Sequence, residues 1–124
     1  MSRVEVRTRS GVYLAELDDS EFSNAMWMSL PREGTANVWG NEIYFEMPGE
    51  VTVQGDVTVL ESGDVAYWPQ GKAICLFFGS TPLSEEDGRP VSAYPVKKIG
   101  RLLGDYSGLE DVGDRTRVVL ERTF

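Results

Sequence analysis

The feature of this sequence that most restricts its fold is the close spacing of its turn signals. From position 35 onward, short apolar segments are separated by turns at Gly40-Asn41, Pro48-Gly49, Gly55-Asp56, Ser62-Gly63-Asp64 and Pro69-Gln70-Gly71. Hydrophobic and polar side chains alternate within several of these segments, as they do in a strand with one buried face. The region therefore predicts a series of short strands joined by tight turns.

The two ends of the chain add further strands. A hairpin is expected around Ser10-Gly11, and the alternation after Pro48-Gly49 continues through Val51 and Val53 to Val57 and Val59. Two final strands are expected near residues 93–103 and 115–122, separated by a Gly/Asp-rich stretch with one helical turn. Residues 79–92 form a loop with an acidic tip at 85–87, which we interpret as solvated and not as a metal site.

One α-helix is expected, over residues 19–30 or so. Asp18 is placed to cap it, with Glu21 three residues later in capping-box spacing, and Pro31 ends it. Its apolar face recurs at helical spacing and would pack on the sheet; it consists of Phe22, Ala25, Met26, Ser29 and Leu30.

Seven or eight short strands and a single early helix predict a mainly β, closed eight-stranded barrel. Residues 1–124 form one domain in this interpretation, with the helix covering one open end. Side chains fill the interior of so small a barrel, so a ligand would bind on its outer face or at a mouth.

Composition excludes several kinds of chemistry. The chain has no histidine and one cysteine, which removes histidine-based catalysis, an internal disulfide and Cys/His metal sites. We therefore expect neither a metal nor a cofactor. The net charge of -8 opposes binding to nucleic acid or an anionic membrane, and the lack of sorting signals favours the cytoplasm.

The charges are unevenly distributed along the chain. No Lys or Arg occurs between Arg32 and Lys72, whereas basic residues gather at both ends. We favour the interpretation that the terminal strands pair and bring basic side chains near the acidic middle. The alternative is an acidic face that serves a cationic ligand.

Seven of the thirteen aromatic residues lie between positions 39 and 78. Strand alternation assigns Phe45, Phe77 and either Phe78 or Trp68 to the core. The others are large, have a polar atom and lie near turns, so they are candidates for a surface groove. The candidate ligand-binding residues are Trp39, Glu42, Tyr44, Tyr67, Trp68, Lys72 and Phe78.

Glu42 and Lys72 are the ionisable members of that set. Both adjoin tight turns beside the aromatic strands, where a barrel mouth could bring them together. Either each remains in water, or burial beside an aromatic ring shifts its pKa towards neutrality, as acid–base chemistry without histidine requires. Cys75 is expected to be a small buried hydrophobe, and Asp64 to brace its own turn.

The segments Asn37–Phe45 and Gly63–Pro82 resemble the small prokaryotic cyclophilin-like proteins, a family of unknown function. The resemblance covers nearly the whole chain, including the Pro-Val-Lys-Lys-Ile-Gly strand at 95–100, and implies a minimal cyclophilin-type barrel. True cyclophilins carry a Phe-His-Arg motif whose arginine contacts the prolyl amide. This chain lacks that motif, and Arg32 and Arg89 lie on expected loops.

These observations lead to three alternative hypotheses for the function. The first is a groove for a small molecule or an extended, proline-containing peptide, lined by Trp39, Tyr44, Tyr67 and Trp68 with Glu42 and Lys72 at its edge. The second is a weak or atypical prolyl isomerase with no assignable catalytic residue. The third is a barrel that assembles with itself as a homo-oligomer.

Overall fold

The computed structural model describes residues 2–124, in which strands dominate. Residue ranges of the ten strands are β1 (Ser2–Thr8), β2 (Gly11–Leu17), β3 (Arg32–Thr35), β4 (Asn37–Trp39), β5 (Glu42–Glu46), β6 (Val57–Val59), β7 (Asp64–Trp68), β8 (Ala73–Phe77), β9 (Val91–Leu103) and β10 (Arg117–Thr123). The helix α1 covers Glu21–Met28, and a 3₁₀ turn covers Ser107–Asp111.

Hydrogen bonds do not close the sheet, so the predicted closed, eight-stranded barrel is wrong. The strands follow the order β3-β10-β1-β2-β9-β7-β8-β5-β4, and β6 pairs with β9 outside this path. The two ends of the path, β3 and β4, are consecutive in the chain and are joined at Ala36. β3 pairs with β10 and β4 pairs with β5, so the chain crosses this seam covalently, without a ladder between β3 and β5.

The two terminal strands pair, as the charge distribution predicted. β1 runs antiparallel to β10, and β1 and β2 form the expected hairpin. Basic residues of β9 reach the acidic middle of the chain: Lys97 Nζ lies 3.1 Å from Asp56 Oδ2, and Lys98 Nζ lies 2.9 Å from Asp64 Oδ1. Asp64 also accepts a hydrogen bond from the Glu61 amide at 2.8 Å, and this bond braces the turn.

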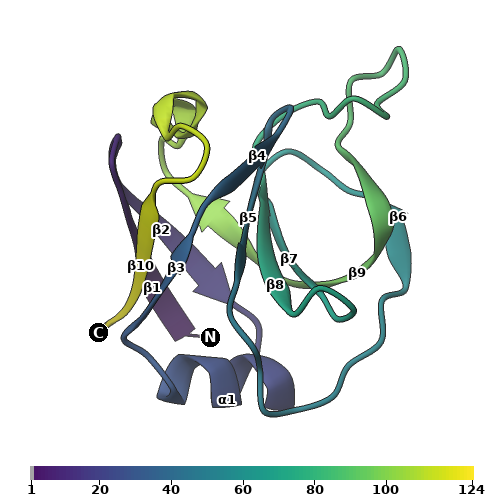
Figure 1. Ribbon diagram of the computed structural model, residues 1–124. Helices are drawn as coiled ribbons and strands as arrows, with labels where there is room; N and C mark the ends of the chain where they lie inside the picture. Colours follow the sequence, from purple (N-terminus) through teal and green to yellow (C-terminus); the bar gives the residue numbers. More distant parts are fainter. Residues whose placement is uncertain (1) are drawn as a thin grey trace.

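The helix is shorter than predicted at both ends, because its N-cap is Ser20 and its C-cap is Ser29. The Ser20 hydroxyl accepts from the Ser23 amide, while Asp18 accepts from both serine hydroxyls at 2.6 Å and so holds the cap in place. Phe22 and Met26 are buried in the main core. In Figure 1 the helix lies below the strands of the sheet. No helix within residues 2–124 is long and apolar enough to cross a membrane.

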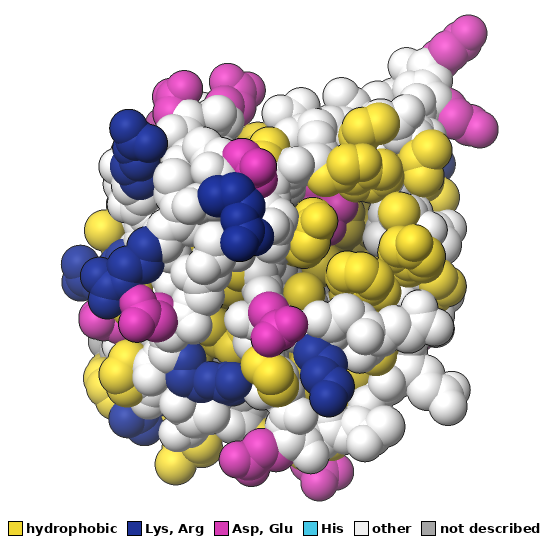
Figure 2. Space-filling model, in the orientation of Figure 1, with side chains coloured by type: hydrophobic (Ala, Val, Ile, Leu, Met, Phe, Trp, Pro, Cys, Tyr) yellow, Lys and Arg dark blue, Asp and Glu magenta, His cyan; other side chains and the backbone are white. Residues whose placement is uncertain are grey.

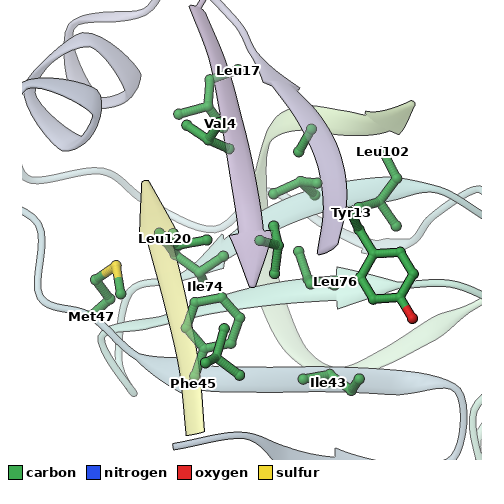
Figure 3. Packing of buried hydrophobic residues seen from close by; sticks show 14 of the residues in the cluster. Val4, Tyr13, Leu17, Ile43, Phe45, Met47, Ile74, Leu76, Leu102 and Leu120 are labelled. Carbon is green, nitrogen blue, oxygen red and sulfur yellow. The ribbon is translucent and has the colours of Figure 1, made fainter. Parts of the chain in front are cut away.

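The main core lies on one face of the sheet. Figure 3 shows side chains from β1, β2, β5, β8, β9 and β10 converging there, among them Val4, Leu17, Phe45, Leu76 and Leu120. Phe45 is fully buried. The Val51 and Val53 segment, predicted to be a strand, forms none, although both side chains pack against this core.

A second, smaller core lies on the opposite face of β5, β7 and β8. It is formed by Leu60, Ala66, Cys75, Phe77 and Val96, with Tyr44 and Trp68 packed against it. This smaller core depends on the length and curvature of strand β9. Its C-terminal part pairs with β2 and β7, whereas its N-terminal part pairs with β6 and curves away (Figure 1).

Candidate functional site: an aromatic pocket with a buried carboxyl group

Strand alternation divides the residues of β5 and β7 between the two cores. On β5, Ile43 and Phe45 belong to the main core, so Glu42 and Tyr44 face the other side. On β7, Tyr67 belongs to the main core, whereas Trp68 packs against the smaller one. The side chains on the second face therefore come from β5 and β7, which lie on either side of β8 in the sheet.

A hollow of about 210 Å³ opens on this second face. Its floor and sides come from β4, β5, β7 and β8, and the N-terminal part of β9 forms the opposite wall. The residues that line it are Trp39, Glu42, Tyr44, Trp68, Cys75, Ser92, Ala93 and Tyr94. We call this hollow the aromatic pocket, because four of the eight residues carry aromatic rings.

Trp68 is the central ring of the pocket. It stacks on Tyr94 with the ring planes 5° apart and the centroids at 5.1 Å, and it meets Tyr44 edge to face at 6.1 Å. The Trp68 Nε1–H group is enclosed and has no hydrogen-bond acceptor among residues 2–124. Buried donors are rarely left without an acceptor, so Trp68 carries a polar atom that the rest of the described chain does not satisfy.

Glu42 is the buried carboxyl group of the pocket, with 5% of its surface exposed. Burial raises its pKa to about 7, because the ionised form loses solvation, and a hydrogen bond from the Cys75 thiol only partly opposes this. Burial, and then the negative charge of Glu42, raise the pKa of the Cys75 thiol well above its usual value. The thiol is therefore protonated at neutral pH and unsuited to nucleophilic attack.

Basic side chains are absent from the pocket lining in the described part of the chain. The ion pairs found among residues 2–124 include none with Glu42. In Figure 2 hydrophobic side chains gather at the right, on the side where β6 and β9 lie, while most visible Lys and Arg side chains lie to the left and below. An ionised Glu42 thus has an apolar surrounding and no counter-ion from the protein.

The comparisons with known proteins bear on the fold and the family. The cyclophilin-like family model matches residues 2–121. The chain belongs to the cyclophilin-like family. A solved structure similar to this cyclophilin-like protein is the hypothetical protein AF2241 from Archaeoglobus fulgidus, with 43% identity and a TM-score of 0.81. The alignment covers 98% of this chain and 95% of that one. No curated protein matches the chain.

The cyclophilin-like fold brings together four of the predicted ligand-binding residues. Trp39, Glu42, Tyr44 and Trp68 all line the aromatic pocket. The β4–β5 hairpin places Trp39 opposite Glu42, and Gly40 takes the positive φ of 60° that its tight turn requires.

The other three predicted residues lie elsewhere. Tyr67 packs on Phe22 in the main core, with ring centroids 4.4 Å apart, and its hydroxyl accepts from the Gly49 amide. Lys72 is exposed in the β7–β8 turn and lies outside the lining of the pocket, so the structure does not bring it to Glu42. Phe78 lines a separate surface hollow beside Tyr106.

The sequence contained a signal against one of these choices. Tyr67 and Trp68 are adjacent on one strand, and adjacent strand residues face opposite sides, so they could not line the same groove. Ser92, Ala93 and Tyr94 were missed as lining residues, because only the curvature of β9 brings them across from β5. Cys75 was correctly expected to be buried, but it also forms part of the pocket floor.

Gly71 positions Trp68 through close contact. A β-carbon at Gly71 would lie 2.3 Å from Cε3 of the Trp68 ring, so the Gly71→Ala variant must displace the ring. We expect the change to reduce the near-ultraviolet circular dichroism of the Trp68–Tyr94 stack and to lower stability by roughly 1–3 kcal/mol. Gln70→Ala, an exposed change in the same turn, is the control. Equal spectra for both variants would contradict this role for Gly71.

Proposed function

We propose that this cyclophilin-like protein binds a small organic ligand, free or as one side chain of an extended peptide, in the aromatic pocket. The observation that carries the proposal is the combination of Glu42, buried without a counter-ion, with the rings of Trp39, Tyr44, Trp68 and Tyr94 around it. A concave, mostly apolar surface with a few polar groups is what small-molecule sites have in common.

The polar groups of the pocket support a ligand rather than a purely structural role. Burying a carboxyl group and an unpaired indole N–H costs stability, and a fold that only needed packing could use apolar side chains at both positions. The Glu42 side chain and Trp68 Nε1 are such groups: Glu42 accepts from the Cys75 thiol but has no counter-ion, and Trp68 Nε1 has no acceptor among residues 2–124. A charged ligand would supply the counter-ion that Glu42 lacks.

The size of the pocket favours a small ligand group. Its volume of about 210 Å³ is below the roughly 300–1,000 Å³ of pockets that hold drug-sized molecules. Half of the Tyr94 surface is exposed at the pocket wall (51%), so an extended segment could also cross the rim while one side chain enters.

The test uses the three tryptophan indole N–H signals in a ¹⁵N-correlated NMR spectrum. Trp39 and Trp68 line the pocket, whereas Trp27 lies on α1 and donates to the Arg3 carbonyl at 2.9 Å, so Trp27 is an internal control. Choline, 3,3-dimethylbutan-1-ol and N-acetylproline methylamide serve as probes. We expect at least one probe to shift the Trp39 and Trp68 signals in a saturable way and to leave Trp27 unchanged.

A matched pair of variants locates the binding. Tyr44→Ala is expected to lower the affinity for the probe at least tenfold, because it removes one wall of the pocket. Tyr106→Ala, a tyrosine beside Ser62 outside the pocket, is expected to have no effect. If no probe shifts the two indoles, or if both variants bind equally, the proposal is wrong.

Prolyl isomerisation has less support from the site. The reaction would need a hydrogen-bond donor placed to stabilise the twisted amide. Arg32 instead donates to the Pro48 carbonyl at 2.8 Å, and Arg89 pairs with Asp87 and Glu61. We expect a protease-coupled assay on several Xaa-Pro peptides to give the uncatalysed rate. A rate above the blank that Tyr44→Ala removes would favour isomerisation instead.

A further inference from the structure

The chemistry of the aromatic pocket points to one class of ligand group. Its lining holds one acid and four aromatic rings, and cationic side chains are absent from that lining among residues 2–124. Cations are attracted to the faces of Trp and Tyr rings, and sites that hold ammonium groups combine several such rings. An anionic ligand would instead meet the Glu42 carboxylate with nothing to offset the repulsion.

We propose that the aromatic pocket binds an alkylammonium group, with Glu42 as its counter-ion and Trp39, Tyr44, Trp68 and Tyr94 as its walls. The inference rests on the proposed function and names the class of ligand. The ammonium group could belong to a small amine or to a lysine side chain, and the two sources share this chemistry.

Charge complementarity is the main support for a cation. Leaving an ionised carboxylate in an apolar site is costly unless an opposite charge accompanies it. The neighbours of Glu42 that can titrate are Tyr44 on β5, Cys75 on β8 and Tyr94 on β9, and none of them carries a positive charge. A cationic ligand would therefore supply the missing partner.

The same arrangement predicts how binding depends on pH. The pKa of Glu42 is about 7 in the free protein, so the carboxyl group is mostly neutral at pH 5 and mostly ionised at pH 8. A cation binds the ionised form and displaces the proton. We therefore expect affinity for an alkylammonium probe to rise at least tenfold from pH 5 to pH 8.

The experiment compares choline with 3,3-dimethylbutan-1-ol, in which carbon replaces the charged nitrogen. Titrations follow the Trp39 and Trp68 indole signals at pH 8 and pH 5, with Trp27 as the internal control. We expect choline to bind at least tenfold more tightly than the alcohol at pH 8 and to lose this preference at pH 5. N-acetyllysine methylamide, with N-acetylnorleucine methylamide as its neutral match, shows whether a lysine side chain fits as well.

Two variants separate the charge of Glu42 from its volume. Glu42→Gln keeps the shape of the side chain and is expected to abolish the preference for choline. Glu46→Gln changes an exposed acid on the same strand and is expected to retain it. Indole signals that remain dispersed in both variants show that each is folded.

The outcomes distinguish this inference from the proposed function. If the alcohol shifts the pocket indoles as strongly as choline at pH 8, the pocket binds ligands but the ammonium assignment is wrong. If the preference for choline survives Glu42→Gln, Glu42 is not the counter-ion. If none of the probes shifts Trp39 or Trp68, the proposed function itself fails.

Discussion

The Glu42→Gln variant is expected to gain roughly 3 kcal/mol of stability relative to the wild type when the pH is raised from 4 to 8. The pKa of Glu42 is about 7 in the folded protein and 4.5 for an ordinary glutamate, which the unfolded chain resembles. Each unit of difference corresponds to about 1.4 kcal/mol. Glutamine does not titrate, so the variant lacks this dependence.

The direction of this change with pH follows from the number of protons that the folded and unfolded states bind at Glu42. Below pH 4 the carboxyl group is protonated in both states, and its burial carries no ionisation cost. Between about pH 4.5 and 7 the unfolded chain loses the proton while the folded protein keeps it. The unfolded state then binds fewer protons at Glu42, so the contribution of Glu42 to wild-type stability falls as the pH rises and levels off above the folded pKa.

Urea denaturation at pH 4, 6 and 8 measures the effect, as the difference in unfolding free energy between Glu42→Gln and the wild type. Other titrating groups cancel in this difference. Glu46→Gln, an exposed glutamate on β5, is expected to give curves parallel to those of the wild type. Parallel curves for Glu42→Gln as well would show that Glu42 has an ordinary pKa and is solvated.

The second large effect is expected at Phe45, which is fully buried in the main core. Phe45→Ala removes a ring that neighbouring strands enclose, and such changes cost about 3–5 kcal/mol. Its chain neighbour Tyr44 is only partly buried and faces the aromatic pocket. Tyr44→Ala is therefore expected to cost less stability and to remove more ligand affinity.

Two measurements on Tyr44 and Phe45 variants test whether the two faces of β5 have separate roles, one in ligand binding and the other in stability. Urea denaturation reports stability, and the indole titration with choline or the alcohol reports the pocket. The milder Phe45→Leu variant keeps the protein folded for the titration and is expected to bind like the wild type. Loss of probe affinity in Phe45→Leu equal to that in Tyr44→Ala would show that the two faces are not independent.

The sequence was sufficient for most local features of the fold. Turn residues such as Gly40 marked hairpins that exist, and strand alternation correctly assigned Phe45 and Phe77 to the core. The helix was predicted correctly but too long. Asp18 was assigned as the cap, whereas Ser20 has that role with Asp18 supporting it, and the helix ends at Met28 with Ser29 as its C-cap. The mainly β class and the family followed from the same patterns and motifs.

Features that depend on pairing between distant segments were not predicted. The closed barrel was inferred from the number of strands, but closure depends on whether β3 and β5 form a ladder. β3 pairs with β10 alone, whereas β5 already has β4 and β8 as partners. Lys72 was considered as a neighbour of Glu42 because both adjoin turns, with separate solvated positions as the alternative. The two turns lie at opposite ends of the β5–β8 pair.

The sequence by itself determined which side chains share a face of each strand, because alternation is a local property of extended backbone. Alternation puts Glu42 and Tyr44 on one face of their strand and Trp68 opposite Tyr67, although the predicted groove included both Tyr67 and Trp68. Only the tertiary structure decided that β9 curves back and stacks Tyr94 on Trp68, about 26 positions along the chain. That packing removes water from Glu42, since desolvation depends on everything that surrounds a group and not on its neighbours in sequence.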